Sequence, residues 1–117
     1  SDNENNLIIV NRRPRFFDIP SLFEIKRPID QSNLNKLAYK LKDDKVKKIN
    51  NFIQIKADLN NVKYLDLTSE ICIEKKSSCI VIHDKNLLFI DNDHFSMAGS
   101  KYYSNKIIQK FIKLKMN

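Results

Sequence analysis

The chain has 117 residues, 42% of them hydrophobic, and a formal net charge of +7. This length suits one domain, and such a share of hydrophobic residues excludes a disordered tail. No run reaches the roughly 18 apolar residues of a membrane span. We recognise no signal peptide, and we expect residues 1–6 to be a flexible lead-in to a domain covering 1–117.

The positive charge alone would suit a partner such as nucleic acid or anionic lipid. The lysines are spread along the chain, however, arginines are few, and no nucleic-acid motif accompanies them. We therefore interpret the lysines as solvated helix faces and expect no nucleic-acid partner. A basic module that binds nucleic acid or an anionic envelope polymer is the alternative.

The first half of the chain predicts one strand and a long helical segment. Residues 7–10 (L-I-I-V) are apolar and β-branched, which indicates a buried parallel strand. A proline-rich loop follows, with one helical turn that Ser21 can cap. From Asp30 to Leu59, apolar residues recur at three- and four-residue steps, as in a helix that covers a sheet. Asp30 or Ser32 is the expected N-cap, and the polar residues 42–45 allow a break.

The second half predicts a strand, a hairpin and a final helix. Residues 62–67 alternate as a strand does, and residues 68–70 can cap a short turn. The β-rich runs 79–83 and 87–90 flank a turn, which indicates a small hairpin. Ser96 can cap the last helix by accepting a hydrogen bond from the backbone N–H of Gly99. The expected apolar stripe of this last helix comprises Tyr102, Ile107, Ile108, Phe111 and Ile112.

The order strand–helix–strand–helix predicts an α/β fold with three layers and a mostly parallel sheet. Only about two central strands are recognisable, and a sheet of two parallel strands rarely stands alone. The chain is therefore expected to be part of a larger unit.

Cys72 and Cys79 are the only cysteines. Their spacing suits a disulfide that closes a short loop, worth roughly 2.5 kcal/mol on the loop-entropy model. Two unrelated thiols in a reducing compartment are the alternative. A zinc site at these cysteines is not expected, because it would need four ligands.

Asp91 and His94 are the residues with the clearest chemistry. An Asp three residues before a His can hold one imidazole nitrogen and leave the other facing a nucleophile, as in a Ser-His-Asp triad. We expect Asp93, the neighbour of His94, to point away. Two alternatives stay open. The three residues could be plain turn and helix-entry residues, or they could bind a divalent metal together with His83.

No serine of the chain has the glycine-flanked setting that exposes a nucleophile near an oxyanion hole. The candidates are Ser21, Ser69, Ser77, Ser78, Ser96, Ser100 and Ser104. Capping explains Ser96 better than nucleophilic attack does.

Residues 90–96 (I-D-N-D-H-F-S), followed by Ala98 and Gly99, resemble the last conserved block of SGNH hydrolases. The form D-D-D-H-L-S-x-x-G is typical of SGNH domains fused to acyltransferase-3-type membrane O-acyltransferases. Residues 64–67 with the two cysteines are similar to that family's strand, cysteine-bounded loop and hairpin. Residues 6–10 and 14–20 resemble its strand and its P-x-x-x-D-V-P loop.

This resemblance implies a partial three-layer SGNH (flavodoxin-like) sandwich with few parallel strands, flanking helices and a small β-hairpin. It implies Asp91 and His94 as the triad acid and base, and Cys72–Cys79 as a disulfide. The family's Gly-Asp-Ser nucleophile block and its oxyanion-hole blocks have no match in these residues. We therefore expect the chain to be the C-terminal portion of such a domain, inactive without the N-terminal half.

The resemblance further implies that the parent is an integral membrane protein with this domain on the extracytoplasmic, periplasmic face. The parent would transfer acyl groups, most often acetyl, from an acyl donor to a cell-envelope glycan such as lipopolysaccharide or peptidoglycan. A serine would be acylated, His94 would move its proton and Asp91 would hold His94. We expect no cofactor and no metal.

Overall fold

A computed structural model of the chain describes residues 7–24 and 30–116. The predicted flexible lead-in, residues 1–6, lies outside the described residues. The described part is a mixed α/β structure of helices and short strands, as the sequence predicts. Among the described helices, none is both long and apolar enough to cross a bilayer.

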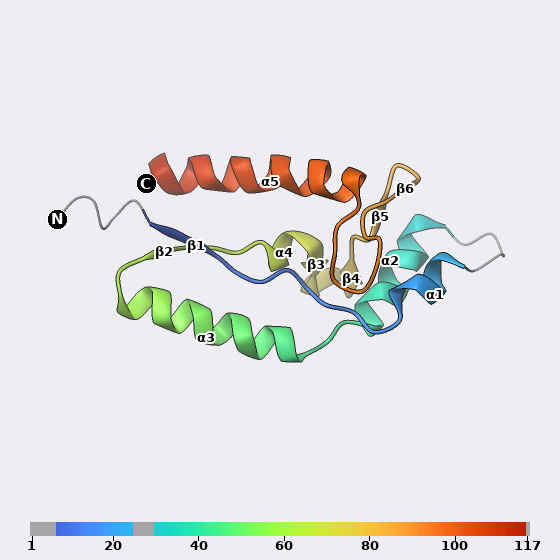
Figure 1. Cartoon of the computed structure of the whole chain (residues 1–117), viewed down its shortest axis with the longest axis horizontal. Coiled ribbons are helices and arrows are strands. Elements are labelled where there is room, and N and C mark those ends of the chain that lie inside the picture. Colours follow the sequence, from blue (N-terminus) through green and yellow to red (C-terminus); the bar gives the residue numbers. More distant parts are fainter. Residues whose placement is uncertain (1–6, 25–29, 117) are drawn as a thin grey trace.

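Two parallel strands, β1 (Ile8–Val10) and β2 (Lys63–Leu65), run between two long helices. Helix α3 (Lys45–Leu59) lies on one side of the strand pair and α5 (Met97–Met116) on the other (Figure 1). Both helices contact β2. Because the strands are parallel, their carboxyl ends meet at the same edge.

The predicted burial of the first strand is wrong. β1 pairs with β2 in parallel, as expected, but Leu7 is 61% and Val10 44% exposed. The physical reason is that no further described strand lies beside β1, so its outer edge is uncovered. An apolar run of this kind is typical of a strand with neighbours on both sides.

The long periodic segment forms two helices, with the break where the polar residues allow it. Helix α2 (Gln31–Lys40) is capped by Asp30, whose carboxylate accepts from the Asn33 N–H at 2.8 Å. The chain between α2 and α3 is fixed instead by the segment after β1: the Phe17 N–H donates to the Leu41 carbonyl at 2.7 Å, and the Asp43 N–H to the Arg15 carbonyl at 2.7 Å.

The first short helix begins earlier than predicted. Helix α1 (Ile19–Phe23) starts two residues before Ser21, which therefore does not cap it. The Ser21 hydroxyl instead donates to the Asp18 carboxylate at 2.7 Å. The buried Ile19 side chain anchors this start in the core.

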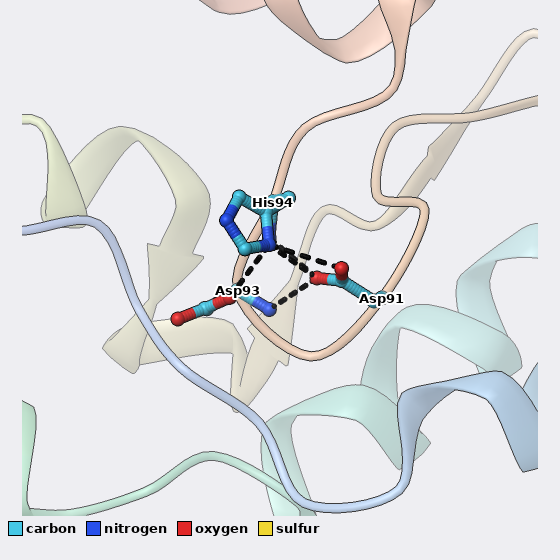
Figure 2. A group of neighbouring side chains, drawn as sticks. All are labelled: Asp91, Asp93 and His94. Carbon is cyan, nitrogen blue, oxygen red and sulfur yellow. Dashed lines mark hydrogen bonds and ion pairs between the residues drawn. The ribbon is translucent and has the colours of Figure 1, made fainter.

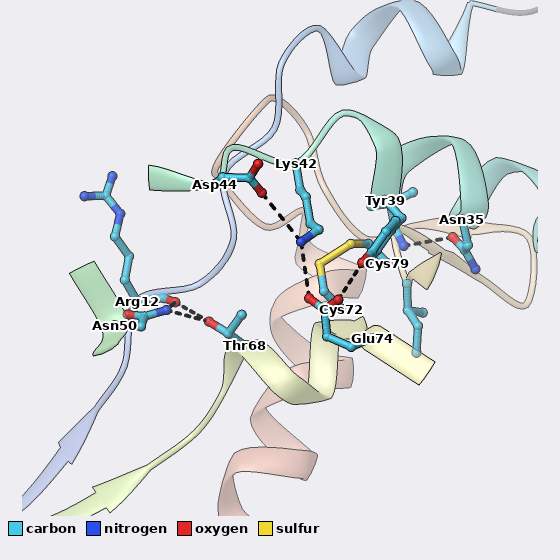
Figure 3. The surroundings of a disulfide bond; sticks show 12 residues. Arg12, Asn35, Tyr39, Lys42, Asp44, Asn50, Thr68, Cys72, Glu74 and Cys79 are labelled. Atoms are coloured by element: carbon cyan, nitrogen blue, oxygen red, sulfur yellow. Dashed lines mark hydrogen bonds and ion pairs between the residues drawn. A yellow bond between two sulfur atoms is a disulfide. The ribbon is translucent and has the colours of Figure 1, made fainter. Parts of the chain in front are cut away.

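A small lobe carries the disulfide. After helix α4 (Thr68–Ile71), strands β3 (Cys72–Ile73) and β4 (Ser78–Cys79) pair antiparallel around the 3₁₀ turn η2 (Glu74–Lys76). Cys72 and Cys79 form a disulfide between the two strands (Figure 3). Sequence analysis did not predict this strand pair.

The predicted hairpin is present as β5 (Ile82–His83) and β6 (Asn86–Leu87). Asp84 and Lys85 at its turn both have positive φ, as a tight two-residue hairpin turn requires. Asn35 of α2 fastens its first strand, accepting from the Val81 N–H at 2.9 Å and the Ile82 N–H at 3.1 Å. Helix α2 thus packs against this hairpin as well as against β4 of the disulfide-bearing strand pair.

Ser96 caps α5 as predicted, because its hydroxyl oxygen accepts from the Gly99 N–H at 2.9 Å. The expected apolar stripe of α5 is only partly buried. Tyr102 and Ile107 are half-buried, whereas the three members Ile108, Phe111 and Ile112 are exposed. The face of α5 that carries these three residues lies uncovered.

Candidate functional site

Asp91 and His94 form a hydrogen-bonded pair in the loop between β6 and α5. The Nδ1 atom of His94 lies 2.9 Å from Oδ1 and 3.0 Å from Oδ2 of Asp91. The second ring nitrogen points away from the carboxylates (Figure 2). The side chains of His94 and Asp91 are 61% and 47% exposed, so this nitrogen can be reached by another group.

The backbone of the same turn also holds Asp91. Its Oδ1 accepts from the N–H of Asp93 at 3.0 Å and from the N–H of His94 at 2.9 Å. The Asp93 N–H, followed by the ring and N–H of His94, lowers the pKa of the Asp91 carboxyl and outweighs the opposing effect of burial. Asp91 is therefore ionised at neutral pH and can stabilise a protonated imidazole.

The expectation that Asp93 points away is wrong. Its Oδ1 also lies 2.9 Å from Nδ1 of His94, because the tight turn brings neighbouring residues onto the same side of the ring (Figure 2). Asp91, Asp93 and His94 could by their atom types hold a divalent cation. His83, the fourth residue of that alternative, lies apart: its ring contacts Asp84 at 3.4 Å and packs at a tilt against the ring of Tyr102.

Buried residues support the loop from below. The fully buried Phe89 pairs through its backbone with Phe95, and their rings meet edge to face with centroids 5.1 Å apart. The Ile90 N–H donates to the His94 carbonyl at 3.0 Å, and the Ser96 N–H to the Leu88 carbonyl at 2.9 Å. Backbone hydrogen bonds thus join the residues before the turn 91–94 to the residues at its end and after it.

The segment that leaves the carboxyl end of β1 flanks the loop. Asn92 accepts two backbone hydrogen bonds from this segment: its carbonyl takes the Phe16 N–H at 2.8 Å, and its side chain takes the Ile19 N–H at 2.8 Å. In open α/β sheets, ligands bind beyond the carboxyl ends of the parallel strands. Asp91 and His94 lie on this side of the strand pair.

Within the described residues, no serine hydroxyl is hydrogen-bonded to His94. Ser96 is the nearest in sequence, and its hydroxyl is engaged in donating to the Leu87 carbonyl at 2.5 Å while it caps α5. The hydroxyls of Ser21 and Ser69 bond to Asp18 and Asp66 on other elements.

Two buried asparagines at the carboxyl ends of the strands were missed by sequence analysis. Asn11 joins the two strand ends, donating to Asp66 at 2.7 Å and accepting from the Leu67 N–H at 2.7 Å. Asn50 of α3 accepts from the Arg12 N–H at 2.8 Å and donates to the Arg12 carbonyl at 2.9 Å (Figure 3). A polar residue directly after an apolar strand was the available signal for Asn11.

Three surface hollows lie away from the Asp91–His94 pair, and the largest, of about 630 Å³, is lined mainly by residues of α2. A second, of about 440 Å³, lies between β2 and α5 and is lined by lysines of α5 together with Glu70. The third, of about 200 Å³, lies between the segment after β1 and α3. None of the three hollows is lined by Asp91 or His94.

The described part of the chain is a mixed α/β structure with an Asp–His pair beyond the carboxyl ends of its two parallel strands. The sequence model of the family described as "SGNH domain (fused to AT3 domains)" matches residues 1–109. The chain therefore belongs to this family, whose domains are associated with acyltransferase-3 proteins. No curated protein and no solved structure matches the chain.

Proposed function

We propose that this chain supplies the acid and the base of a Ser-His-Asp acyl-transfer site in an SGNH-type O-acyltransferase or esterase domain. The observation that carries the proposal is the hydrogen bond from Nδ1 of His94 to Asp91, with the second ring nitrogen accessible. Asp91 selects the tautomer in which Nε2 is free to take a proton.

In the proposed reaction, Nε2 of His94 carries out each proton transfer. Nε2 of His94 takes the proton of the serine hydroxyl as its oxygen attacks the carbonyl of the acyl donor. The imidazolium, stabilised by ionised Asp91, returns that proton to the leaving group, and an acyl-serine remains. In the second half, Nε2 takes the proton of an acceptor hydroxyl, whose oxygen attacks the carbonyl of the acyl-serine. The imidazolium then returns this proton to the serine oxygen as the acyl–serine bond breaks, which leaves the acylated acceptor and the free serine.

The serine and the oxyanion-hole donors are proposed to come from another segment of the parent domain. The chain would then be the C-terminal portion of the domain, with residues 1–117 completing a site that the N-terminal half begins. Engagement of the Ser96 hydroxyl as a helix cap supports this division, because it leaves the nearest serine unavailable as a nucleophile.

The exposed surface of helix α3 is one argument that the sheet of the complete domain extends beyond β1. Its polar flank, which includes Lys47, Asn51 and Gln54, lines a hollow together with Tyr64 of β2. Its opposite flank is apolar and exposed. This apolar flank comprises Ile49, Phe52, Ile55 and Leu59.

Helix α5 has the same asymmetry on the other side of the strands. Lys106, Gln109 and Lys113 line a hollow with Tyr64 of β2, so the polar flank again lies on the β2 side. The exposed apolar residues of α5 lie on the opposite face of the helix from this polar flank. We propose that further parallel strands continue at the β1 edge and complete a three-layer SGNH sandwich.

The proposed reaction is acyl transfer, most often of acetyl, to a cell-envelope glycan such as lipopolysaccharide. Fusion to AT3 domains supports a membrane parent that delivers the acyl donor. The Cys72–Cys79 disulfide supports an oxidising compartment, hence the periplasmic face of the membrane.

Ester hydrolysis by the complete domain tests the proposal. The domain should hydrolyse p-nitrophenyl acetate, and His94→Ala should reduce kcat by at least about 10³-fold. His83→Ala is the matched control, because it removes the chain's other histidine from the hairpin. Full activity of His94→Ala would refute the assignment. A fluorophosphonate should not label the chain alone, and stoichiometric labelling would show a nucleophile within it.

A basic binding module is the second candidate, favoured by one observation. Lys106, Lys110 and Lys113 line the hollow between β2 and α5, with Lys110 paired to Glu70 at 3.3 Å. Binding of an anionic envelope polymer there should weaken steeply with added salt, which fluorescence anisotropy measures. Affinity that does not change with salt would count against this candidate.

A further inference from the structure

The side chain of Arg13 contacts both chain neighbours of His94. Its Nε donates a hydrogen bond to the carbonyl oxygen of Asp93. Its guanidinium carbon lies 5.6 Å from the centroid of the Phe95 ring. One part-buried side chain, which comes from the segment after β1, thus holds the residues immediately before and after the candidate base.

We call these two contacts of Arg13, with the Asp93 carbonyl and with the Phe95 ring, the Arg13 clamp. The clamp matters because few groups pack against the His94 side chain. This side chain is 61% exposed, and it sits on a loop whose own closing hydrogen bond joins Ile90 to His94. Fixing an exposed side chain and its backbone costs conformational entropy. The loop therefore depends on contacts from elsewhere, which Arg13 and the backbone bonds to Asn92 provide.

The chemistry of the contact requires arginine. A guanidinium is planar, so it can donate an in-plane hydrogen bond from Nε while its face lies over an aromatic ring. The ammonium of a lysine is a point charge at the end of a flexible chain, and it cannot make both contacts in this geometry. A lysine at position 13 would keep the charge and lose the clamp.

We propose that Arg13 is a positioning residue that fixes His94 through Asp93 and Phe95, so that the imidazole keeps its orientation toward Asp91. This inference rests on the proposed acyl-transfer function and adds a residue from a distant segment to its site. Arg13 need not touch the substrate to do this. A displacement of about 1 Å in such a base can lower the rate by about 100-fold.

The isotopically labelled chain tests the positioning without any enzyme assay. We compare Arg13→Lys and Arg13→Ala with Arg15→Ala, which removes the same charge from an exposed side chain two residues further on. In the unaltered chain, the 15N resonance of Nδ1 of His94, detected through the carbon-bound ring protons, should be that of a protonated nitrogen because Nδ1 is bonded to Asp91.

Both Arg13 variants should broaden or lose this resonance, and Arg15→Ala should keep it. Retention of the resonance in Arg13→Lys would mean that charge alone matters, and retention in Arg13→Ala would mean that no clamp exists. Either result overturns the inference. Thermal unfolding of the three variants checks that the fold is intact, and loss of the resonance without loss of the fold supports positioning.

The complete AT3-fused protein provides a second readout. Arg13→Lys and Arg13→Ala should each lower kcat by about 10- to 100-fold and leave KM unchanged. A change in KM with constant kcat would instead assign Arg13 to substrate binding and overturn the inference. If His94→Ala stays active while the resonance behaves as expected, the proposed function fails and the positioning of His94 by Arg13 still holds.

Discussion

Gly99, the only glycine of the chain, provides the sharpest test of how α5 is seated beside the candidate site. A Cβ atom added at Gly99 would lie 1.8 Å from the carbonyl oxygen of Leu88. Real Cβ atoms do not approach within 3.0 Å of such an atom, so the first turn of α5 and Leu88 must separate by more than about 1 Å. The Ser96 N–H donates to that same carbonyl at 2.9 Å, and the separation weakens this bond.

Helix propensity and packing predict opposite signs for Gly99→Ala. Propensity alone would stabilise the helix by about 1 kcal/mol. Overpacking costs about 1–3 kcal/mol, and loss of the bond from Ser96 to Leu88 costs about 0.5–1.5 kcal/mol. We therefore expect the free energy of unfolding to fall by about 2 kcal/mol.

Urea unfolding followed by circular dichroism measures this difference. Ser100→Ala is the matched control, because Ser100 is exposed on the next position of the same helix and should gain a few tenths of a kcal/mol from propensity. A Gly99→Ala chain that is as stable as the unaltered one, or more stable, would refute the close approach of α5 to Leu88.

Three further predictions concern the disulfide, a buried amide and the acid of the pair. Replacing Cys72 and Cys79 by serine should lower the free energy of unfolding by about 2.5 kcal/mol, and reducing agent should then have no further effect on the urea midpoint. Asn50→Ala removes three hydrogen bonds from a buried side chain and should cost about 2–3 kcal/mol in urea unfolding, whereas Asn51→Ala should stay within about 0.5 kcal/mol. The folded-state pKa of Asp91 is lowered, so its contribution to the turn is present above the ordinary Asp pKa of about 3.9 and is lost as pH falls through the folded value. The 13C chemical shift of the Asp91 side-chain carboxyl should therefore show its main titration step below the ordinary Asp pKa; a main step at or above that value would contradict the lowered pKa.

The features predicted correctly from sequence are those with a local pattern. The break between α2 and α3 follows a polar stretch, the cap at Asp30 follows from helix-start chemistry, and Ser96 reaches Gly99 three residues on. The family was also recognisable from the short block around His94. Each of these signals needs only residues within one or two turns of each other.

The contacts that were missed join residues far apart in the sequence. Arg13 and Asp93 are separated by 80 residues, and Asn50 and Arg12 by 38, so neither pair has a spacing that a periodic pattern can reveal. The burial of residues 7–10 was overestimated for a different reason. An apolar run indicates that a strand tends to be buried. It does not show whether a neighbouring strand is present to bury it.

The two hydrogen bonds that Asn92 receives have a consequence for how this site can diversify. Both come from main-chain N–H groups, those of Phe16 and Ile19, so these two bonds do not depend on which side chains stand at positions 16 and 19. Proline is excluded at these two positions because it has no N–H. Phe17 and Asp18 lie between them with exposed side chains, so substitutions of these two side chains leave both hydrogen bonds in place. Side-chain variation at these two positions is therefore compatible with an unchanged backbone around Asn92.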